Sequence, residues 1–75
     1  MKVKLGDQDS HLYFKYKIGD KVHSKYGPSG GVVIGGDCYP DPEFNAVYYT
    51  VKMPNGRIET YRQNDIELVH IKLSH

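Results

Sequence analysis

The run from Tyr49 to Tyr61 constrains the fold of this chain more than any other part of the sequence. Two segments that alternate apolar with polar residues flank Asn55-Gly56. Asn-Gly between such segments is the strongest short-range signal for a β-hairpin, because both residues tolerate the positive φ angles of a type I′ turn. The run therefore predicts two antiparallel strands joined by a two-residue turn.

The length of that turn also predicts which residues face each other across the hairpin. A two-residue turn places Lys52 opposite Glu59, with their opposite charges on the solvent side, and Thr50 opposite Tyr61. Side chains alternate between the two faces of a strand, so a slip of one residue would transfer Tyr61 to the core. In the predicted register the core face carries Val47, Tyr49, Val51, Met53 and Ile58.

The remaining patterns predict a small all-β domain. Residues 13–18 alternate and lead through a Gly-Asp turn into a strand over 21–26, and a glycine-rich turn at 27–31 precedes a short strand over 32–34. Five short strands with turn signals at regular spacing are typical of a barrel. The other predicted strands are 46–53, the second strand of the hairpin and 66–71.

The segments between these strands lack periodicity. Residues 37–45 contain two prolines and are predicted to be the longest loop, and residues 63–65 are predicted to form a single 3₁₀ turn. The expected domain therefore covers residues 13–71. Residues 1–12 are expected to be a flexible tail or an extra edge strand, and residues 72–75 a tail.

Composition limits the compartment and the function. The 75 residues carry a formal net charge of +1, which argues against a binder that relies only on attraction to phosphates. Cys38 is the single cysteine, so no intramolecular disulfide can form and a reducing, cytoplasmic location is expected. No apolar stretch is long enough to span a membrane as a helix.

The stretch from Ile18 to Val69 resembles the SH3-like small barrels of the KOW and Tudor type. The resemblance lies in Ile18-Gly19-Asp20-Lys21-Val22, the glycine turn, the Asn-Gly hairpin and the closing Ile66-Glu67-Leu68-Val69. Gly19-Asp20-Lys21-Val22-His23 is also similar to the opening of the RNA polymerase-interaction domain of CarD and the transcription-repair coupling factor. The resemblance implies a single SH3-like five-stranded barrel. It also implies a non-catalytic module that binds a larger macromolecular complex through protein-protein contacts. The resemblance favours a transcription complex as the partner, and small accessory or phage-encoded regulators act in this way.

A second resemblance suggests an enzyme as an alternative. Ile58-Glu59-Thr60-Tyr61 is similar to the Val-Gln-Ile-Tyr strand of the small tetrameric, trimethoprim-insensitive dihydrofolate reductases. Glu59 stands where that family has Gln, and a carboxylate there would repel an anionic substrate and cofactor. We therefore expect no enzymatic activity.

Aromatic residues predict a protein-binding surface. Exposed tyrosines combine apolar area with a polar tip and are enriched in interfaces, and they can also cage a cationic side chain. The expected surface consists of Tyr39, Phe44, Tyr48, Tyr61 and Arg57, with Arg62 and Lys52 at its rim.

Direct nucleic-acid binding remains the alternative, because basic residues alternate with tyrosines near the first strand. Lysine and arginine neutralise phosphates, while lysines on an edge strand also prevent aggregation. The residues of this alternative site are Lys15, Lys17, Lys21, Lys25 and Arg62.

Catalytic and metal sites are not expected. Cys38 lacks the basic neighbours that activate a thiol, and the acidic residues at 37, 41 and 43 lie in a predicted loop that does not fix their spacing. Candidate metal ligands occur without the spacing of known zinc sites, so no metal or cofactor is expected. These ligands are His11, His23, His70, His75, Cys38, Asp37 and Asp41.

Overall fold

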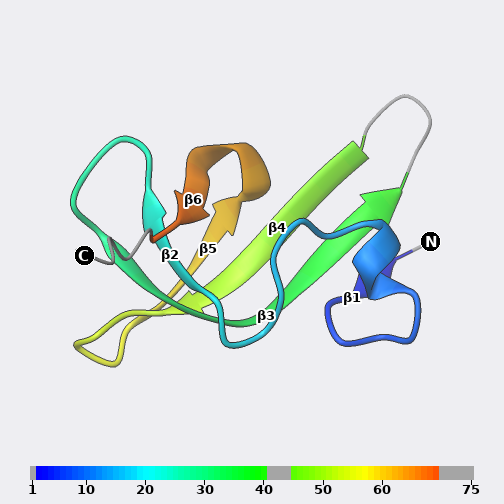
Figure 1. Cartoon of the computed structure of the whole chain (residues 1–75), viewed down its shortest axis with the longest axis horizontal. Helices are drawn as coiled ribbons and strands as arrows, with labels where there is room; N and C mark the ends of the chain where they lie inside the picture. The colour runs from blue at the N-terminus through cyan, green and yellow to red at the C-terminus, as the bar shows by residue number, and fades with distance from the viewer. Residues whose placement is uncertain (1, 41–44, 70–75) are drawn as a thin grey trace, which may run out of the picture.

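A computed structural model describes residues 2–40 and 45–69, apart from the side chain of residue 45. The described residues form short and long strands and two 3₁₀ turns, without an α-helix (Figure 1). No helix in this part of the chain could cross a membrane. In chain order the elements are β1 (Val3–Lys4), η1 (Ser10–Leu12), β2 (Lys21–Ser24), β3 (Gly30–Pro40), β4 (Asn45–Lys52), β5 (Ile58–Arg62), η2 (Gln63–Asp65) and β6 (Ile66–Leu68).

All six strands belong to one antiparallel sheet. The order across the sheet is β5-β4-β3-β2-β6, and β1 pairs with β3 beyond the end of β2. β3 is the longest strand, because its first half pairs with β2 and its second half with β1, while β4 runs along its other edge. The sheet confirms the predicted all-β class, and the N-terminal segment supplies an extra edge strand.

The hairpin forms at the predicted place, but its predicted register is wrong by one residue. Lys52 lies opposite Ile58 and Thr50 opposite Thr60, so Lys52 and Glu59 do not face each other. The turn contains Pro54, Asn55 and Gly56: the N–H of Gly56 donates to the C=O of Met53, and the N–H of Met53 donates to the C=O of Arg57. Of the turn residues only Gly56 has a positive φ, at 88°.

Pro54 explains the shift in register. Its ring fixes φ near −65°, which suits the second position of a type I turn. The glycine that follows then adopts the left-handed conformation and forms a bulge, which gives a three-residue connection. The two-residue turn predicted from Asn-Gly left out this third residue. As a result the predicted core residue Ile58 faces outward and is 60% exposed.

The predicted loop over 37–45 is also wrong for its described part. Residues 37–40 complete β3, and Cys38 lies opposite Val47 of β4. Cys38 is 0% exposed and belongs to the core. The two prolines suggested a loop, yet Pro40 is the last residue of the strand. Residues 41–44 lie outside the described part.

Residues 13–18 alternate like a strand but do not form one. This segment crosses the inner face of β3 and β4 without joining the sheet (Figure 1). Phe14 and Tyr16 point into the core, whereas Ile18 is 52% exposed. The N–H groups of Lys15 and Tyr16 donate to the Tyr49 hydroxyl at 2.9 and 3.0 Å. A side chain of β4 therefore replaces the neighbouring strand as the hydrogen-bond partner of this segment.

The core lies between the inner face of the sheet and this crossing segment. The rings of Phe14 and Tyr16 contact the Tyr49 ring, with centroids 5.6 and 5.3 Å away. The Tyr16 hydroxyl donates to the C=O of Ile66 at 3.1 Å, which ties the segment to the beginning of β6. The buried residues are Phe14, Tyr16, Val22, Val33, Cys38, Val47, Tyr49, Val51 and Ile66.

Candidate functional site

The outer face of the sheet brings two tyrosines and an arginine together. Tyr48 of β4 lies directly opposite Asp37 of β3 and Arg62 of β5. Tyr39, two residues after Asp37, faces the same side because side chains alternate along a strand. Tyr39, Tyr48 and Arg62 thus form a row across three neighbouring strands, which we call the tyrosine–arginine row.

Ring geometry shows that the members of this row are in contact range. The Tyr39 and Tyr48 rings lie edge to face, with centroids 6.3 Å apart and planes at 76°, an arrangement favoured by the charge distribution of aromatic rings. The Arg62 guanidinium carbon lies 6.0 Å from the centre of the Tyr48 ring, which is within the range of a cation–π contact. Because Tyr39 is 45% exposed, the row is accessible from solvent.

Asp37 adds an acidic group beside the row. Its carboxylate lies 3.6 Å from the Lys2 ammonium, and both side chains are partly exposed. The sequence pattern predicts a loop at Asp37, so this position on the outer face of β3 was not expected. The alternation of Gly36 and Cys38 inward with Asp37 and Tyr39 outward is the signal that could have revealed the strand.

Other members of the predicted protein-binding surface lie elsewhere. Tyr61 faces Tyr49 on the inner side of the sheet and packs against the core, so its predicted outward orientation is wrong. Its hydroxyl donates to Glu59 at 2.7 Å. The pKa of the Tyr61 hydroxyl is raised, mainly by this hydrogen bond and to a smaller extent by burial. Lys52 is on the outer face at the far end of β4, and Phe44 is outside the described residues.

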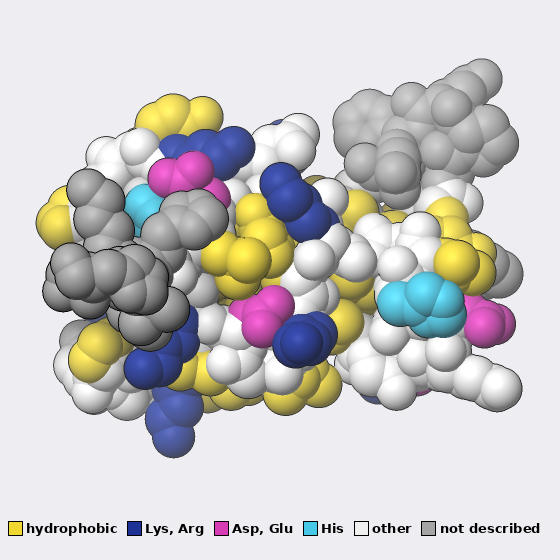
Figure 2. Space-filling view, viewed as in Figure 1, with side chains coloured by type: hydrophobic (Ala, Val, Ile, Leu, Met, Phe, Trp, Pro, Cys, Tyr) yellow, Lys and Arg dark blue, Asp and Glu magenta, His cyan; other side chains and the backbone are white. Residues whose placement is uncertain are grey.

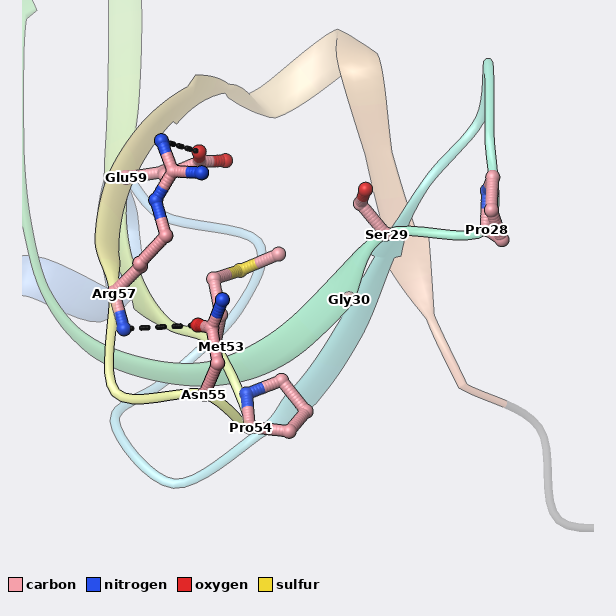
Figure 3. Close-up of a pocket in the computed structure, with 8 residues that line it drawn as sticks. All are labelled: Pro28, Ser29, Gly30, Met53, Pro54, Asn55, Arg57 and Glu59. Carbon is pink, nitrogen blue, oxygen red and sulfur yellow. Dashed lines mark hydrogen bonds and ion pairs between the residues drawn. The ribbon is translucent and has the colours of Figure 1, made fainter.

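Arg57 belongs to a shallow pocket at the hairpin turn. The pocket has a volume of about 370 Å³ and lies between the turn before β3 and the turn before β5 (Figure 3). Arg57 reaches along one side of it and forms an ion pair of 3.4 Å with Glu59. The Met53 side chain projects into the space between the two turns. The lining residues are Pro28, Ser29, Gly30, Met53, Pro54, Asn55, Arg57 and Glu59.

The basic residues of the nucleic-acid alternative are exposed but belong to several parts of the fold. Lys15 and Lys17 lie on the crossing segment, Lys21 begins β2 and Lys25 follows its end. Arg62 is on β5, which β4 and β3 separate from β2 in the sheet. On the face seen in Figure 2, basic side chains are interspersed with acidic and hydrophobic ones.

The candidate metal and nucleophilic residues do not form a recognisable centre in the described part of the chain. No three His, Cys, Asp or Glu side chains among the described residues are grouped closely enough to hold a metal ion. His23 pairs with Glu67 at 3.3 Å across β2 and β6. Burial raises the pKa of the Cys38 thiol, which disfavours the reactive thiolate. His70, His75 and Asp41 lie outside the described residues.

The segment Ile58–Tyr61, on which the reductase alternative rests, lies entirely within β5. Ile58 and Thr60 face outward, while Glu59 and Tyr61 face inward and bond to each other. Comparison with known proteins finds no relative of this chain: no family model, curated protein or solved structure matches it.

Proposed function

We propose that this chain is a non-catalytic protein-binding module built on an SH3-like barrel, and that the tyrosine–arginine row is its contact surface. The strand order supports this barrel type. β2, β3, β4 and β5 follow one another as a meander, and the closing strand β6 returns to pair with β2. The 3₁₀ turn η2, which precedes the closing strand, lies where the sequence predicts it.

The observation that carries the proposal is the contact of Tyr39, Tyr48 and Arg62 on a solvent-facing sheet surface. Tyrosine and arginine are, together with tryptophan, enriched among the residues that dominate the energy of protein interfaces. Here three strands fix their positions, so little conformational entropy is lost when a partner binds. Arg62 gives the row a positive end, which favours an acidic group on the partner.

The resemblance of Gly19-Asp20-Lys21-Val22-His23 to polymerase-interaction domains suggests the class of partner. We propose a transcription complex, with bacterial RNA polymerase as the first protein to test. A lysine-based nucleic-acid site is the weaker candidate, because its residues are distributed over the crossing segment, β2 and β5.

The test measures binding of the purified chain to immobilised bacterial RNA polymerase, with and without nuclease treatment, at low and at high salt. Tyr48→Ala should weaken binding by at least about tenfold, because truncating a residue that dominates an interface costs about 2 kcal/mol or more, and tenfold corresponds to about 1.4 kcal/mol. Thr50→Ala is the matched control, since Thr50 is the next outward-facing residue of β4. Its binding should equal that of the unchanged chain.

The salt dependence separates the two candidate functions. Contacts to phosphates weaken steeply as salt rises, whereas an aromatic protein interface is screened much less. Absence of binding to the polymerase would refute this partner. Binding that vanishes at moderate salt and after nuclease treatment, and is equal for Tyr48→Ala, would refute the tyrosine–arginine row and favour the lysines.

A further inference from the structure

The outer edge of β5 is available for strand pairing. β5 is the last strand of the sheet, with β4 on one side, and none of the described residues pairs with its other side. An open strand edge presents unpaired N–H and C=O groups that can pair with another chain. In the described part of the fold, β6 is the other end of the sheet path, but it has only the residues Ile66–Leu68.

The hydrogen-bond pattern of the hairpin identifies the groups on this edge. The N–H of Met53 donates to the C=O of Arg57 at 2.7 Å. Hydrogen-bonded and non-hydrogen-bonded pairs alternate along an antiparallel ladder. The pair Lys52–Ile58 is therefore non-hydrogen-bonded, and the same follows for the pairs of Thr60 and Arg62. The backbone groups of Ile58, Thr60 and Arg62 consequently point away from β4, toward the open edge.

We propose that a second copy of this chain pairs with this edge, β5 against β5, about a two-fold axis that passes through Thr60. In this register Thr60 faces Thr60 of the other copy, and Ile58 faces Arg62. All edge-facing backbone groups of the three residues then pair with one another. Registers centred on Glu59 or Tyr61 leave part of these groups outside the strand pair.

The side chains also favour the register centred on Thr60. Opposed threonines are a stabilising cross-strand pair, whereas opposed like charges are destabilising. Ile58, which is 60% exposed, would be covered by the aliphatic stem of Arg62 from the other copy. On the inner face, Glu59 would lie opposite Tyr61. A register centred on Glu59 would instead place two carboxylates directly opposite each other.

Chain size gives an independent reason to expect a partner subunit. A domain of 75 residues has a small core, and such domains are commonly supplemented by a disulfide, a metal or oligomerisation. The single cysteine excludes an intramolecular disulfide. One strand pair buries less area than the about 1,200 Å² of standard interfaces, so the dimer should be weak and depend on concentration.

The dimer would extend the sheet across both copies. A two-fold axis perpendicular to the sheet keeps the outer faces on the same side, so the two tyrosine–arginine rows would face one direction. Two linked contact surfaces raise the overall affinity for a partner with repeated sites. The pairing itself rests on β5 alone and is independent of the proposed function.

Hydrogen exchange of the unmodified chain, measured by NMR at several concentrations, is the first test. The amides of Ile58, Thr60 and Arg62 should become protected as the concentration rises. The amides of Glu59 and Tyr61 face β4 and should be protected at every concentration. Fast exchange at the three edge amides in the most concentrated sample would overturn the proposal, and so would protection that does not change with concentration.

Sedimentation equilibrium of two variants provides the second test. Thr60→Pro removes an edge-facing N–H but no bond to β4, and it should raise the dimer dissociation constant at least about tenfold. Thr60→Ala is the control, because it keeps the N–H, and it should change the constant much less. A monomer at all concentrations, a species larger than a dimer, or equal constants for the two variants would each refute the pairing.

Discussion

The hydroxyl of Tyr49 provides the most direct test of how this fold is held together. It accepts hydrogen bonds from the N–H groups of Lys15 and Tyr16 and donates one to the amide oxygen of Gln63. A hydroxyl has one donor and two acceptor positions, so all three are used. Tyr49 is 0% exposed. This single group thus connects β4, the crossing segment and η2.

Tyr49→Phe removes the hydroxyl and keeps the ring. The N–H of Lys15 retains a second acceptor, Gln63, at 2.9 Å. The buried N–H of Tyr16 loses the acceptor that it has in the structure. A buried unsatisfied donor costs about 1–3 kcal/mol, and the lost bond to Gln63 adds about 1 kcal/mol. We therefore expect a loss of about 2–4 kcal/mol in the free energy of unfolding.

Chemical denaturation and thermal melting measure this loss. In a domain of this size it corresponds to a fall of at least about 8 °C in the melting temperature. Tyr48→Phe is the matched control, because it makes the same chemical change at the next residue, which faces outward; its stability should change by less than about 0.5 kcal/mol. Equal stabilities of the two variants would refute the role assigned to the Tyr49 hydroxyl.

Three further predictions concern glycine packing, the buried thiol and pH. Gly31→Ala should destabilise the fold by about 1–3 kcal/mol, because the added Cβ would clash with the C=O oxygen of Lys52. Gly35→Ala is the control and should be nearly neutral, because a Cβ added there has no neighbour within 4 Å. Equal denaturation midpoints of the two variants would contradict the prediction. Cys38 should react with an alkylating reagent only when the fold opens, so its labelling rate should rise with denaturant, and fast labelling of the native protein would place the thiol at the surface. Burial raises the pKa values of Cys38 and Tyr49, and the hydrogen bond to Glu59 raises that of Tyr61, from ordinary values of 9.0 for the thiol and 10.0 for the hydroxyls. As the pH rises, the unfolded chain therefore loses these protons before the folded chain does. The contribution of these groups to the free energy of unfolding should be fully present below their ordinary pKa values and should be lost as the pH rises above those values. Denaturation midpoints that stay constant between about pH 8 and about pH 11 would contradict this prediction.

Local sequence signals predicted the elements that depend on local chemistry. The alternation at Val47, Tyr49 and Val51 correctly predicted the buried face of β4, since a strand with one buried face repeats every second residue. Asn55-Gly56 located the hairpin, and the polar residues 63–65 predicted the 3₁₀ turn η2. Tyr39, Tyr48 and Arg62 were among the residues expected at a binding surface.

The tertiary structure decided what depends on distant partners. The hairpin register is an exception, because its cause is local: Pro54 lengthened the turn by one residue, and this shift moved Tyr61 to the inner face and Ile58 outward. The crossing segment alternates like a strand, but the hydroxyl of Tyr49, far away in the sequence, provides its hydrogen bonds. Cys38 is buried because it lies in the middle of the sheet, between β1 and β4, on the face that packs against the core. The apolar periodicity of a sequence indicates which side chains are buried. It does not indicate which distant group will form hydrogen bonds with the backbone, because that depends on the tertiary structure.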